Sequence, residues 1–320
     1  MPLPSVEALL ADDPEFEDTP DTRCAVVTAA QHGQRLDKTL VALAPEFSRS
    51  HLQQLIDKGH VQVGGVVAHA ASRRVKAGQT VQVVLAPTEE SLAFRPQTMA
   101  LAVMFEDEHL LVLDKPAGLV VHPAPGNWSG TLLNGLLAHH AAAATLPRAG
   151  IVHRLDKDTS GVMMVGKTLS AVTALTRAIA ARQVHRRYLA IALGHAPAAE
   201  FSIEAPVGRD PVVRVRMAVV NGGRASRTDV RRVAESGAYT ALSCTLHSGR
   251  THQIRVHLAS RGLPLVADAL YGGKPALGLQ RQALHATELR LQHPSSGAPL
   301  AFECPPPADF AVAWSQLLVR

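Results

Sequence analysis

The sequence has little with which to build a covalent or metal-bound framework. Its three cysteines, Cys24, Cys244 and Cys304, lie far apart and include no Cys-x-x-Cys pair. This odd number and wide spacing argue against both a disulfide framework and a zinc site. The sixteen histidines do not change that conclusion, because none falls in a His-Glu-x-x-His or similar ligand pattern. We therefore expect reduced thiols and no bound metal.

Long apolar runs are also missing. No stretch approaches the roughly 18 consecutive apolar residues that a membrane-spanning helix needs. Residues 1–21 are acidic and lack the basic start and apolar run of a signal peptide. Hydrophobic residues make up 47% of the chain and charged residues 18%, a balance typical of a globular protein with a sizeable core. These features predict a cytoplasmic protein with no membrane partner.

Charge is unevenly distributed along the chain. Residues 1–23 carry seven acidic side chains against the single Arg23, whereas the remainder holds 31 basic and 20 acidic residues. A basic folded body suits an anionic partner, since lysine and arginine neutralise phosphates and release condensed counterions. Ordinary solubilising charge is the alternative explanation, and composition alone does not exclude it.

The pattern of residues divides the 320-residue chain into four parts. Residues 1–30 hold several prolines among acidic residues and predict a flexible acidic leader. Residues 31–86 predict a compact module in which helices around Leu36–Leu43 and Leu52–Ile56 precede short valine-rich strands. Residues 87–98, with Pro87 and Pro96, predict a linker, and residues 99–320 predict one larger domain.

The small module is basic near the predicted helix starts, where backbone N–H groups also favour phosphate. The basic residues that we expect to bind RNA are Arg35, Lys38, Arg49, Lys58, Arg73 and Arg74. The pattern Arg35-Leu36-Asp37-Lys38, followed by Ser48-Arg49-Ser50 and residues 56–63, resembles the αL RNA-binding domain of a small-subunit ribosomal protein and some tRNA synthetases. A helical hairpin with a solvated basic face is the alternative.

In the larger domain, strand-like and helix-like segments alternate, but most predicted strands follow one another without an intervening helix. This order favours an α+β fold with a mixed, largely antiparallel sheet. The predicted strands are 110–113, 119–121, 162–165, 188–193, 214–220 and 239–246. The predicted helices are 132–143, 170–183 and 251–261, the last beginning at Thr251.

Asp156 is the strongest candidate for chemistry in this domain. It follows the short apolar pair Ile151-Val152 and precedes a predicted strand, in a turn rich in Asp, Thr, Ser and Gly. A side chain on such a turn lies where function concentrates. Turn aspartates also commonly bond nearby backbone N–H groups, so the local pattern alone leaves capping and catalysis equally open.

A longer pattern supports catalysis. The segment His153-Arg154-Leu155-Asp156-x-x-Thr159-Ser160-Gly161 matches the signature of the RluA-type RNA pseudouridine synthases, many of which also carry an αL module. Three further blocks occur in the expected order, namely Leu113 to Pro123, Arg186-Arg187-Tyr188, and Gly249 to His257. The resemblance covers about residues 30–320. Within the family, the segments 122–127, 149–159 and 282–287 are most similar to the branch that acts on large-subunit (23S) ribosomal RNA.

The resemblance implies roles for four side chains. Asp156 is the catalytic carboxylate, Arg255 is its ion-pair partner, and Tyr188 stacks on the target base and handles a proton. Arg154 occupies the gap that a flipped nucleotide leaves, because a planar guanidinium can stack as well as bind phosphate. The alternatives are an exposed helix arginine for Arg255, a core tyrosine for Tyr188, and a salt bridge from Arg154 to Asp114 or Asp158.

The implied reaction is an isomerisation of uridine to pseudouridine without redox change, so no metal or organic cofactor is expected. The aspartate acts either as a nucleophile at the anomeric carbon or as the base that removes a sugar proton, and the sequence leaves both open. The expected partner is structured ribosomal RNA, bound by a monomer. The competing hypotheses are another RNA target, a non-catalytic ribosome-assembly factor, and a glycosidase with a second acid.

Overall fold

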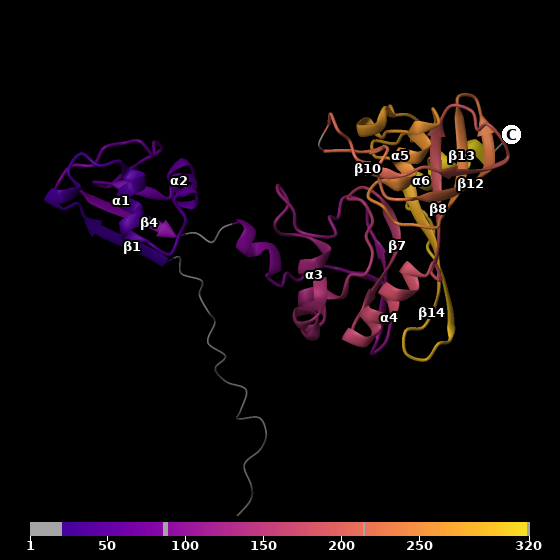
Figure 1. Ribbon diagram of the computed structural model, residues 1–320, viewed down its shortest axis with the longest axis horizontal. Coiled ribbons are helices and arrows are strands. Elements are labelled where there is room, and N and C mark those ends of the chain that lie inside the picture. Colours follow the sequence, from indigo (N-terminus) through magenta and orange to yellow (C-terminus); the bar gives the residue numbers. More distant parts are fainter. Residues whose placement is uncertain (1–20, 86–88, 214, 319–320) are drawn as a thin grey trace, which may run out of the picture. The chain divides into compact units, whose positions relative to one another are not determined.

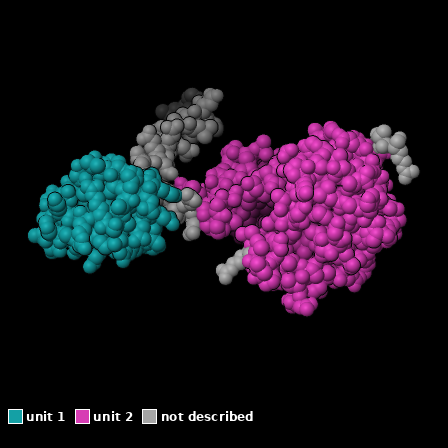
Figure 2. All heavy atoms as spheres, turned by 90° about the horizontal axis from the view of Figure 1, so that it is seen from above, with its two compact units in different colours: residues 1–89 teal, residues 90–320 magenta. Residues whose placement is uncertain are grey.

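The computed structural model describes residues 21–85, 89–213 and 215–318 (Figure 1). The chain divides into two compact units, Met1–Glu89 and Glu90–Arg320, which Figure 2 distinguishes by colour. Most of the expected acidic leader lies outside the described residues. Within them, no helix combines the length and the apolar character needed to cross a membrane.

Unit 1 contains two helices packed on a small antiparallel sheet with the strand order β1-β4-β2-β3. Its elements are β1 (Asp21–Val26), α1 (Leu36–Leu43), α2 (Arg49–Asp57), β2 (Val61–Val63), β3 (Val66–Val67) and β4 (Thr80–Leu85). The Ser48 side chain caps α2 by accepting a hydrogen bond from the backbone N–H of His51. Leu36, Leu40, Leu52 and Ile56 are fully buried in the core of this unit, as their helical spacing predicts.

Two expected boundaries are wrong. Strand β1 falls inside the expected leader (1–30), yet it pairs with β4 from Asp21 to Val26. It is an edge strand with almost no buried side chain, so it lacks the hydrophobic alternation that marks a strand in sequence. The expected linker (87–98) also includes the 3₁₀ segment η3 (Glu89–Phe94), and Asn134 of unit 2 donates to the carbonyls of Leu92 and Ala93.

Unit 2 is built on a mixed sheet with the strand order β5-β6-β7-β14-β8-β13-β12-β9, and β15 pairs with β14. The strands are β5 (Ala102–Glu106), β6 (Leu110–Lys115), β7 (Ser160–Gly166), β8 (His185–Leu193), β9 (Glu200–Glu204), β12 (Arg227–Ser236), β13 (Tyr239–Leu246), β14 (Leu284–Gln292) and β15 (Pro299–Glu303). Among the described strands of this sheet, only β7 and β14 run parallel. The predicted α+β class with a largely antiparallel sheet is confirmed.

Helices cover both faces of this sheet. They are α3 (Leu132–His139), α4 (Leu169–Ala180), α5 (Gln253–Ser260) and α6 (Ala308–Leu318). Figure 1 shows α4 beside β7, and α6 beside β12 and β13. Neighbouring residues of β13 point to opposite faces, so Leu242 packs in the same core as Ile254 of α5, and Ala241 packs with Phe310 of α6.

Several predicted elements need correction. Residues 119–121 are not a strand, because the carbonyls of Val120 and Val121 accept hydrogen bonds from the first amides of α3. The strand predicted over 214–220 shortens to β11 (Met217–Val219), which pairs with β10 (Val207–Arg209). Helix α5 begins at Gln253 rather than Thr251, since the preceding residue His252 adopts a left-handed conformation with φ 56°.

Candidate active site

The Asp156 loop is anchored at both of its ends to strand β7 of the large sheet. Before it, Ile151 forms a bridge with Val165 of β7, and after it, Ser160 begins that same strand. The N–H of Thr159 donates to the backbone carbonyl of Asp156 and closes the turn. Gly161 lets β7 approach β14, because a Cβ there would lie 2.1 Å from the carbonyl oxygen of Ala286. The glycine that ends the motif is therefore required by strand packing.

A buried lysine joins the block Leu113 to Pro123 to this loop. Lys115 is 0% exposed, and its ammonium group donates to the carbonyls of Pro116, Leu119 and Lys157. Burial lowers the pKa of Lys115 to about 8, although the nearby carboxylates of Asp158 and Asp156 oppose that shift. Three carbonyl partners satisfy the three ammonium hydrogens, so Lys115 fixes the loop residue that follows Asp156.

Arg255 connects two carboxylates that are far apart in the sequence. Its Nη1 lies 2.9 Å from Oδ2 of Asp156, while Nε and Nη2 lie 2.7 Å and 2.9 Å from the two oxygens of Asp268. Arg255 is 6% exposed and Asp268 is 1% exposed. Burial opposes the charge of Arg255, but hydrogen bonds and charge from Asp268 and Asp156 raise its pKa above the ordinary value. The expected pair of Asp156 and Arg255 is present, and Asp268 completes it.

His252 and Tyr271 lie beside the ion pair of Asp156 and Arg255. The Nε2 of His252 lies 3.8 Å from Oδ1 of Asp156, and its Nδ1 lies 2.8 Å from the hydroxyl of Tyr271. The guanidinium of Arg255 lies 5.0 Å from the centre of the Tyr271 ring. The Tyr271 hydroxyl also accepts from the N–H of Met217 in β11, so the short hairpin β10–β11 is tied to the site.

Asp156 faces a cleft of about 790 Å³ within unit 2. The polar and aromatic side chains that line it include Asp156, Tyr188, Arg255, His252, Arg154, Arg148, His122 and Trp128. Tyr188 lies in β8 and is 4% exposed, and burial raises the pKa of its hydroxyl. In the part of the chain that the structure describes, no protein group forms a hydrogen bond with that hydroxyl, so it is available to a ligand in the cleft.

Arg154 lines the same cleft and is exposed. Within residues 21–85, 89–213 and 215–318, no ion pair joins it to Asp114 or Asp158, so the salt-bridge alternative does not hold there. The neighbouring His153 accepts a hydrogen bond at Nε2 from the N–H of Met164. Burial, followed by the charge of Arg186, lowers the pKa of His153 to about 3, which keeps its ring neutral at pH 7.

Two of the six basic residues expected to bind RNA in unit 1 share one buried carboxylate. Asp37 is 0% exposed and accepts hydrogen bonds from Arg35, Arg49 and Gln53. The hydrogen bond from Arg35 is the largest cause that holds the pKa of Asp37 well below its ordinary range. This arrangement brings Arg35 and Arg49 together, while Lys38, Lys58 and Arg74 lie exposed and Arg73 is half-buried.

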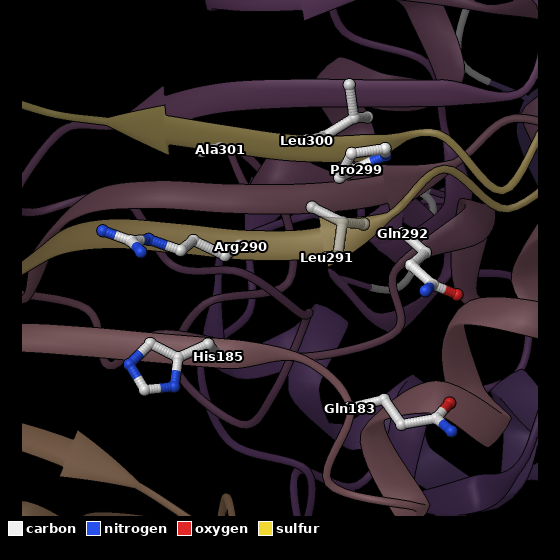
Figure 3. Close-up of a pocket in the computed structure, with 8 residues that line it drawn as sticks. All are labelled: Gln183, His185, Arg290, Leu291, Gln292, Pro299, Leu300 and Ala301. Atoms are coloured by element: carbon white, nitrogen blue, oxygen red, sulfur yellow. The ribbon is translucent and has the colours of Figure 1, made fainter.

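A second hollow, of about 500 Å³, lies between the start of β8 and the β14–β15 hairpin (Figure 3). His185 and Arg290 face each other across paired strands, and Leu291 and Leu300 supply apolar wall. None of its eight lining residues is acidic, and none lines the cleft around Asp156. Over the described ranges, no group of three or more His, Cys, Asp or Glu side chains could hold a metal ion.

Comparison with known proteins identifies the family. A sequence model described as RNA pseudouridylate synthase matches residues 109–260, and a model of the S4 domain matches residues 34–81. A protein of Nitrosomonas europaea named ribosomal large subunit pseudouridine synthase D is 46% identical over 87% of this chain and 83% of its own length. The chain belongs to the RNA pseudouridine synthase family.

Two further relatives of this pseudouridine synthase carry the same name. The protein from Xanthomonas campestris is 46% identical over 92% of each chain, and that from Escherichia coli is 42% identical over 89% of this chain and 91% of its own. The solved structure of human RNA pseudouridylate synthase domain containing 4 gives a TM-score of 0.54 at 20% identity, over 72% of this chain and 95% of that chain. At that identity the structural match shows the fold alone.

For this pseudouridine synthase, sequence reasoning missed part of the site. The sequence patterns assign no role in this site to Asp268, Tyr271, His252 or Arg148. The family pattern at Gly249 to His257 identifies Arg255. Its other partners, Asp268 and Tyr271, lie at the residue before the 3₁₀ segment Ala269–Tyr271 and at the end of that segment. No sequence spacing links that segment to Asp156, so only the fold brings them together.

Proposed function

We propose that this pseudouridine synthase isomerises specific uridines in large-subunit (23S) ribosomal RNA, with Asp156 as the catalytic carboxylate. The observation that carries the proposal is the hydrogen-bonded chain of Asp268, Arg255 and Asp156, which presents one carboxylate to a cleft of about 790 Å³. A guanidinium that is fixed on one side by Asp268 orients the carboxylate of Asp156. The choice of ribosomal RNA rests on the names of the relatives.

The reaction breaks the bond between N1 of uracil and C1′ of ribose and forms a bond between C5 and C1′. The hydrogen on C5 leaves as a proton, N1 takes up a proton, and no electron is gained or lost overall. The Asp156 carboxylate either attacks C1′ or removes a proton from C2′. In the first route the carboxylate leaves C1′ when C5 bonds there, and in the second it returns the proton to C2′. It is regenerated in both cases, so the proposal needs no metal or organic cofactor.

The other residues assist by position. The target uridine leaves its stack at a cost of a few kcal/mol, and the exposed guanidinium of Arg154 fills the vacancy. Tyr188 stacks on the released base, and its hydroxyl, which faces the cleft without a protein partner, handles the proton that leaves C5. Arg255 acts through Asp156 and is held by Asp268.

The S4-type unit supplies affinity for the RNA backbone. The guanidiniums of Arg35 and Arg49 share one buried Asp37, so the cluster keeps a net positive charge and a fixed geometry. Lys38, Lys58, Arg73 and Arg74 extend the basic surface for phosphates. The proposal places the enzyme in the cytoplasm as a monomer, with unit 1 as an RNA-binding domain and unit 2 as the catalytic domain.

The test compares RNA from cells that carry the wild type, an Asp156→Asn variant, an Asp158→Asn variant or a deletion. Carbodiimide labelling followed by reverse transcription maps pseudouridine, which has the same mass as uridine. We expect sites in large-subunit RNA to disappear in the deletion and Asp156→Asn strains and to persist in the Asp158→Asn strain. Sites that persist with Asp156→Asn would refute the assignment of the carboxylate, and sites lost only from other RNA classes would refute the substrate.

A further inference from the structure

The cleft around Asp156 has lining residues that the proposed mechanism does not use. Arg148, Trp128 and His122 line the same cavity as Asp156. Trp128 belongs to the loop between β6 and α3, whereas Arg148 precedes the Asp156 loop. The lining therefore includes an indole and a guanidinium, the two kinds of side chain on which unpaired nucleotides stack and bind.

The backbone beneath Arg148 is held in an unfavourable conformation. Arg148 has φ 54° and ψ 36°, Ala149 has φ 54° and ψ 31°, and Gly150 follows with φ 83°. Residues with a Cβ rarely adopt this left-handed region, and such conformations persist where packing enforces them and cluster at functional sites. Here Ala149 is 5% exposed, and a Cβ on Gly150 would lie 2.0 Å from the carbonyl oxygen of Gly166. The packing of Ala149 and Gly150 therefore holds the backbone at the exposed Arg148 in this conformation.

The positive charges of Arg148 and Arg154 are not paired with acidic side chains among the described residues. Across the described residues, no hydrogen bond or ion pair involves the side chain of Arg148 or that of Arg154. Burial, followed by the charges of Arg154 and Arg148, lowers the pKa of His122 to about 4, so this histidine is neutral at pH 7. Two exposed guanidiniums therefore face the cleft near a neutral ring, which favours an anionic ligand.

Trp128 differs from the other tryptophan of the chain. Trp314 lies in α6 and stacks on Phe310, with ring centres 5.7 Å apart, in the hydrophobic cluster on the far face of β13. Trp128 follows the Ala124–Asn127 turn, is only half-buried, and lines the cleft. An indole in that position presents a face on which any base can stack.

We propose that Arg148 and Trp128 form a second nucleotide subsite, which holds the RNA nucleotide adjacent to the target uridine. Trp128 stacks on the base of that neighbour, and Arg148 binds its phosphate. Such a subsite is useful because the RNA backbone is continuous. The flipped uridine stays bonded to its neighbours, so a neighbouring nucleotide must lie at the mouth of the cleft. The inference deepens the proposed function, since it takes RNA as the substrate of the Asp156 cleft.

Tryptophan fluorescence tests the stacking contact directly. In a Trp314→Phe protein, Trp128 is the only tryptophan of the chain. We expect its emission to be quenched when a stem-loop RNA binds, whereas the matched Trp128→Phe protein, which retains Trp314, shows no change. The RNA spans a uridine that the in-cell map shows to depend on this enzyme, whatever RNA class it belongs to. If the proposed substrate class is wrong, the in-cell map shows it. The fluorescence experiment still tests the subsite.

Binding measurements test the phosphate contact. Arg148→Asn removes the charge but keeps a residue that tolerates the left-handed conformation, so we expect Kd to rise about tenfold. The slope of log Kd against log salt should fall by about one, and Arg148→Lys should recover part of the affinity. An RNA in which the neighbouring nucleotide is abasic should bind the wild type more weakly than the intact RNA does. Trp128→Ala should bind the abasic and the intact RNA with the same Kd. The subsite would be overturned if the emission of Trp314→Phe is not quenched and Arg148→Asn leaves Kd and the salt slope unchanged. The wild type must isomerise the same RNA in that experiment.

Discussion

Asp268 holds Arg255 by both oxygens, at 2.7 Å and 2.9 Å, and leaves only the outer nitrogen of the guanidinium for Asp156. The carboxylate of Asp156 is thus oriented by a buried residue that does not line the cleft. Replacing the buried Asp268 by asparagine leaves Arg255 with one charged partner and with freedom to rotate. The geometry of Asp156 depends on this contact.

We therefore expect Asp268→Asn to lower the free energy of unfolding by about 3 kcal/mol, as for a buried ion pair that loses one partner. The rate of isomerisation should fall at least about tenfold, because a misplaced carboxylate is costly. Urea denaturation measures the first effect, and release of tritium from RNA labelled at C5 of uridine measures the second.

Asp309→Asn is the matched control, since Asp309 also pairs with an arginine, Arg281, at 2.7 Å. The Asp309 side chain is 44% exposed, so its loss should cost less than about 1 kcal/mol and leave the rate unchanged. Equal rates for Asp268→Asn and the wild type would show that Asp268 has no positioning role.

Tyr188→Phe separates the ring from the hydroxyl. The hydroxyl has no protein partner in the described part of the chain, so its removal should change the free energy of unfolding by less than about 1 kcal/mol. If the hydroxyl handles a proton, kcat should fall by about a hundredfold. The Kd for RNA should stay within a factor of about three, because the stacking ring remains. A kcat that matches the wild type would restrict Tyr188 to stacking.

His153 should make the enzyme sensitive to acid. Its folded-state pKa of about 3 lies below the ordinary value of 6.5, so between these values the unfolded chain binds a proton that the folded chain does not. Stability is therefore full above pH 6.5 and falls as the pH drops toward 3.

His153→Gln removes this titration while keeping an oxygen that can accept the hydrogen bond from Met164. We expect the urea midpoint of the variant to fall less steeply between pH 6.5 and pH 4 than that of the wild type. The exposed His69 provides the control, because His69→Gln should leave the slope unaltered. Parallel pH profiles for His153→Gln and the wild type would contradict the prediction.

Gly161→Ala should disrupt the junction between the Asp156 loop and the sheet. Its φ is 116°, and its Cβ would lie 2.1 Å from the carbonyl oxygen of Ala286. We expect a loss of about 3 kcal/mol or more in unfolding free energy, since the backbone of β14 cannot yield as a flexible side chain could.

Gly130→Ala shares the positive φ, at 65°, but has no atom within 4 Å of the added Cβ. Its cost should be limited to the conformational strain of about 1 kcal/mol. Thermal unfolding of both variants gives the comparison, and equal losses would mean that the contact with Ala286 is relieved at little cost.

Elements with a regular hydrophobic period could be predicted from sequence, whereas those that bury polar groups could not. Helices α1, α2 and α4 and strands β6, β8 and β13 follow patterns of apolar residues. Strand β14 buries His285 and Glu288, and half of the residues of β12 are charged, so neither shows the alternation expected of a strand. Their places are set by pairing with β8 and β13.

The sequence by itself determined the family, the α+β class, and the motif that contains Asp156, because these depend on local order and on a long specific pattern. The tertiary structure decided which groups surround that carboxylate. Asp268 lies 112 positions after Asp156 in the chain, and Arg148 gains its direction from the packing of Gly150 on Gly166. Such contacts arise from strand order and close packing, which no spacing of residues along the chain records.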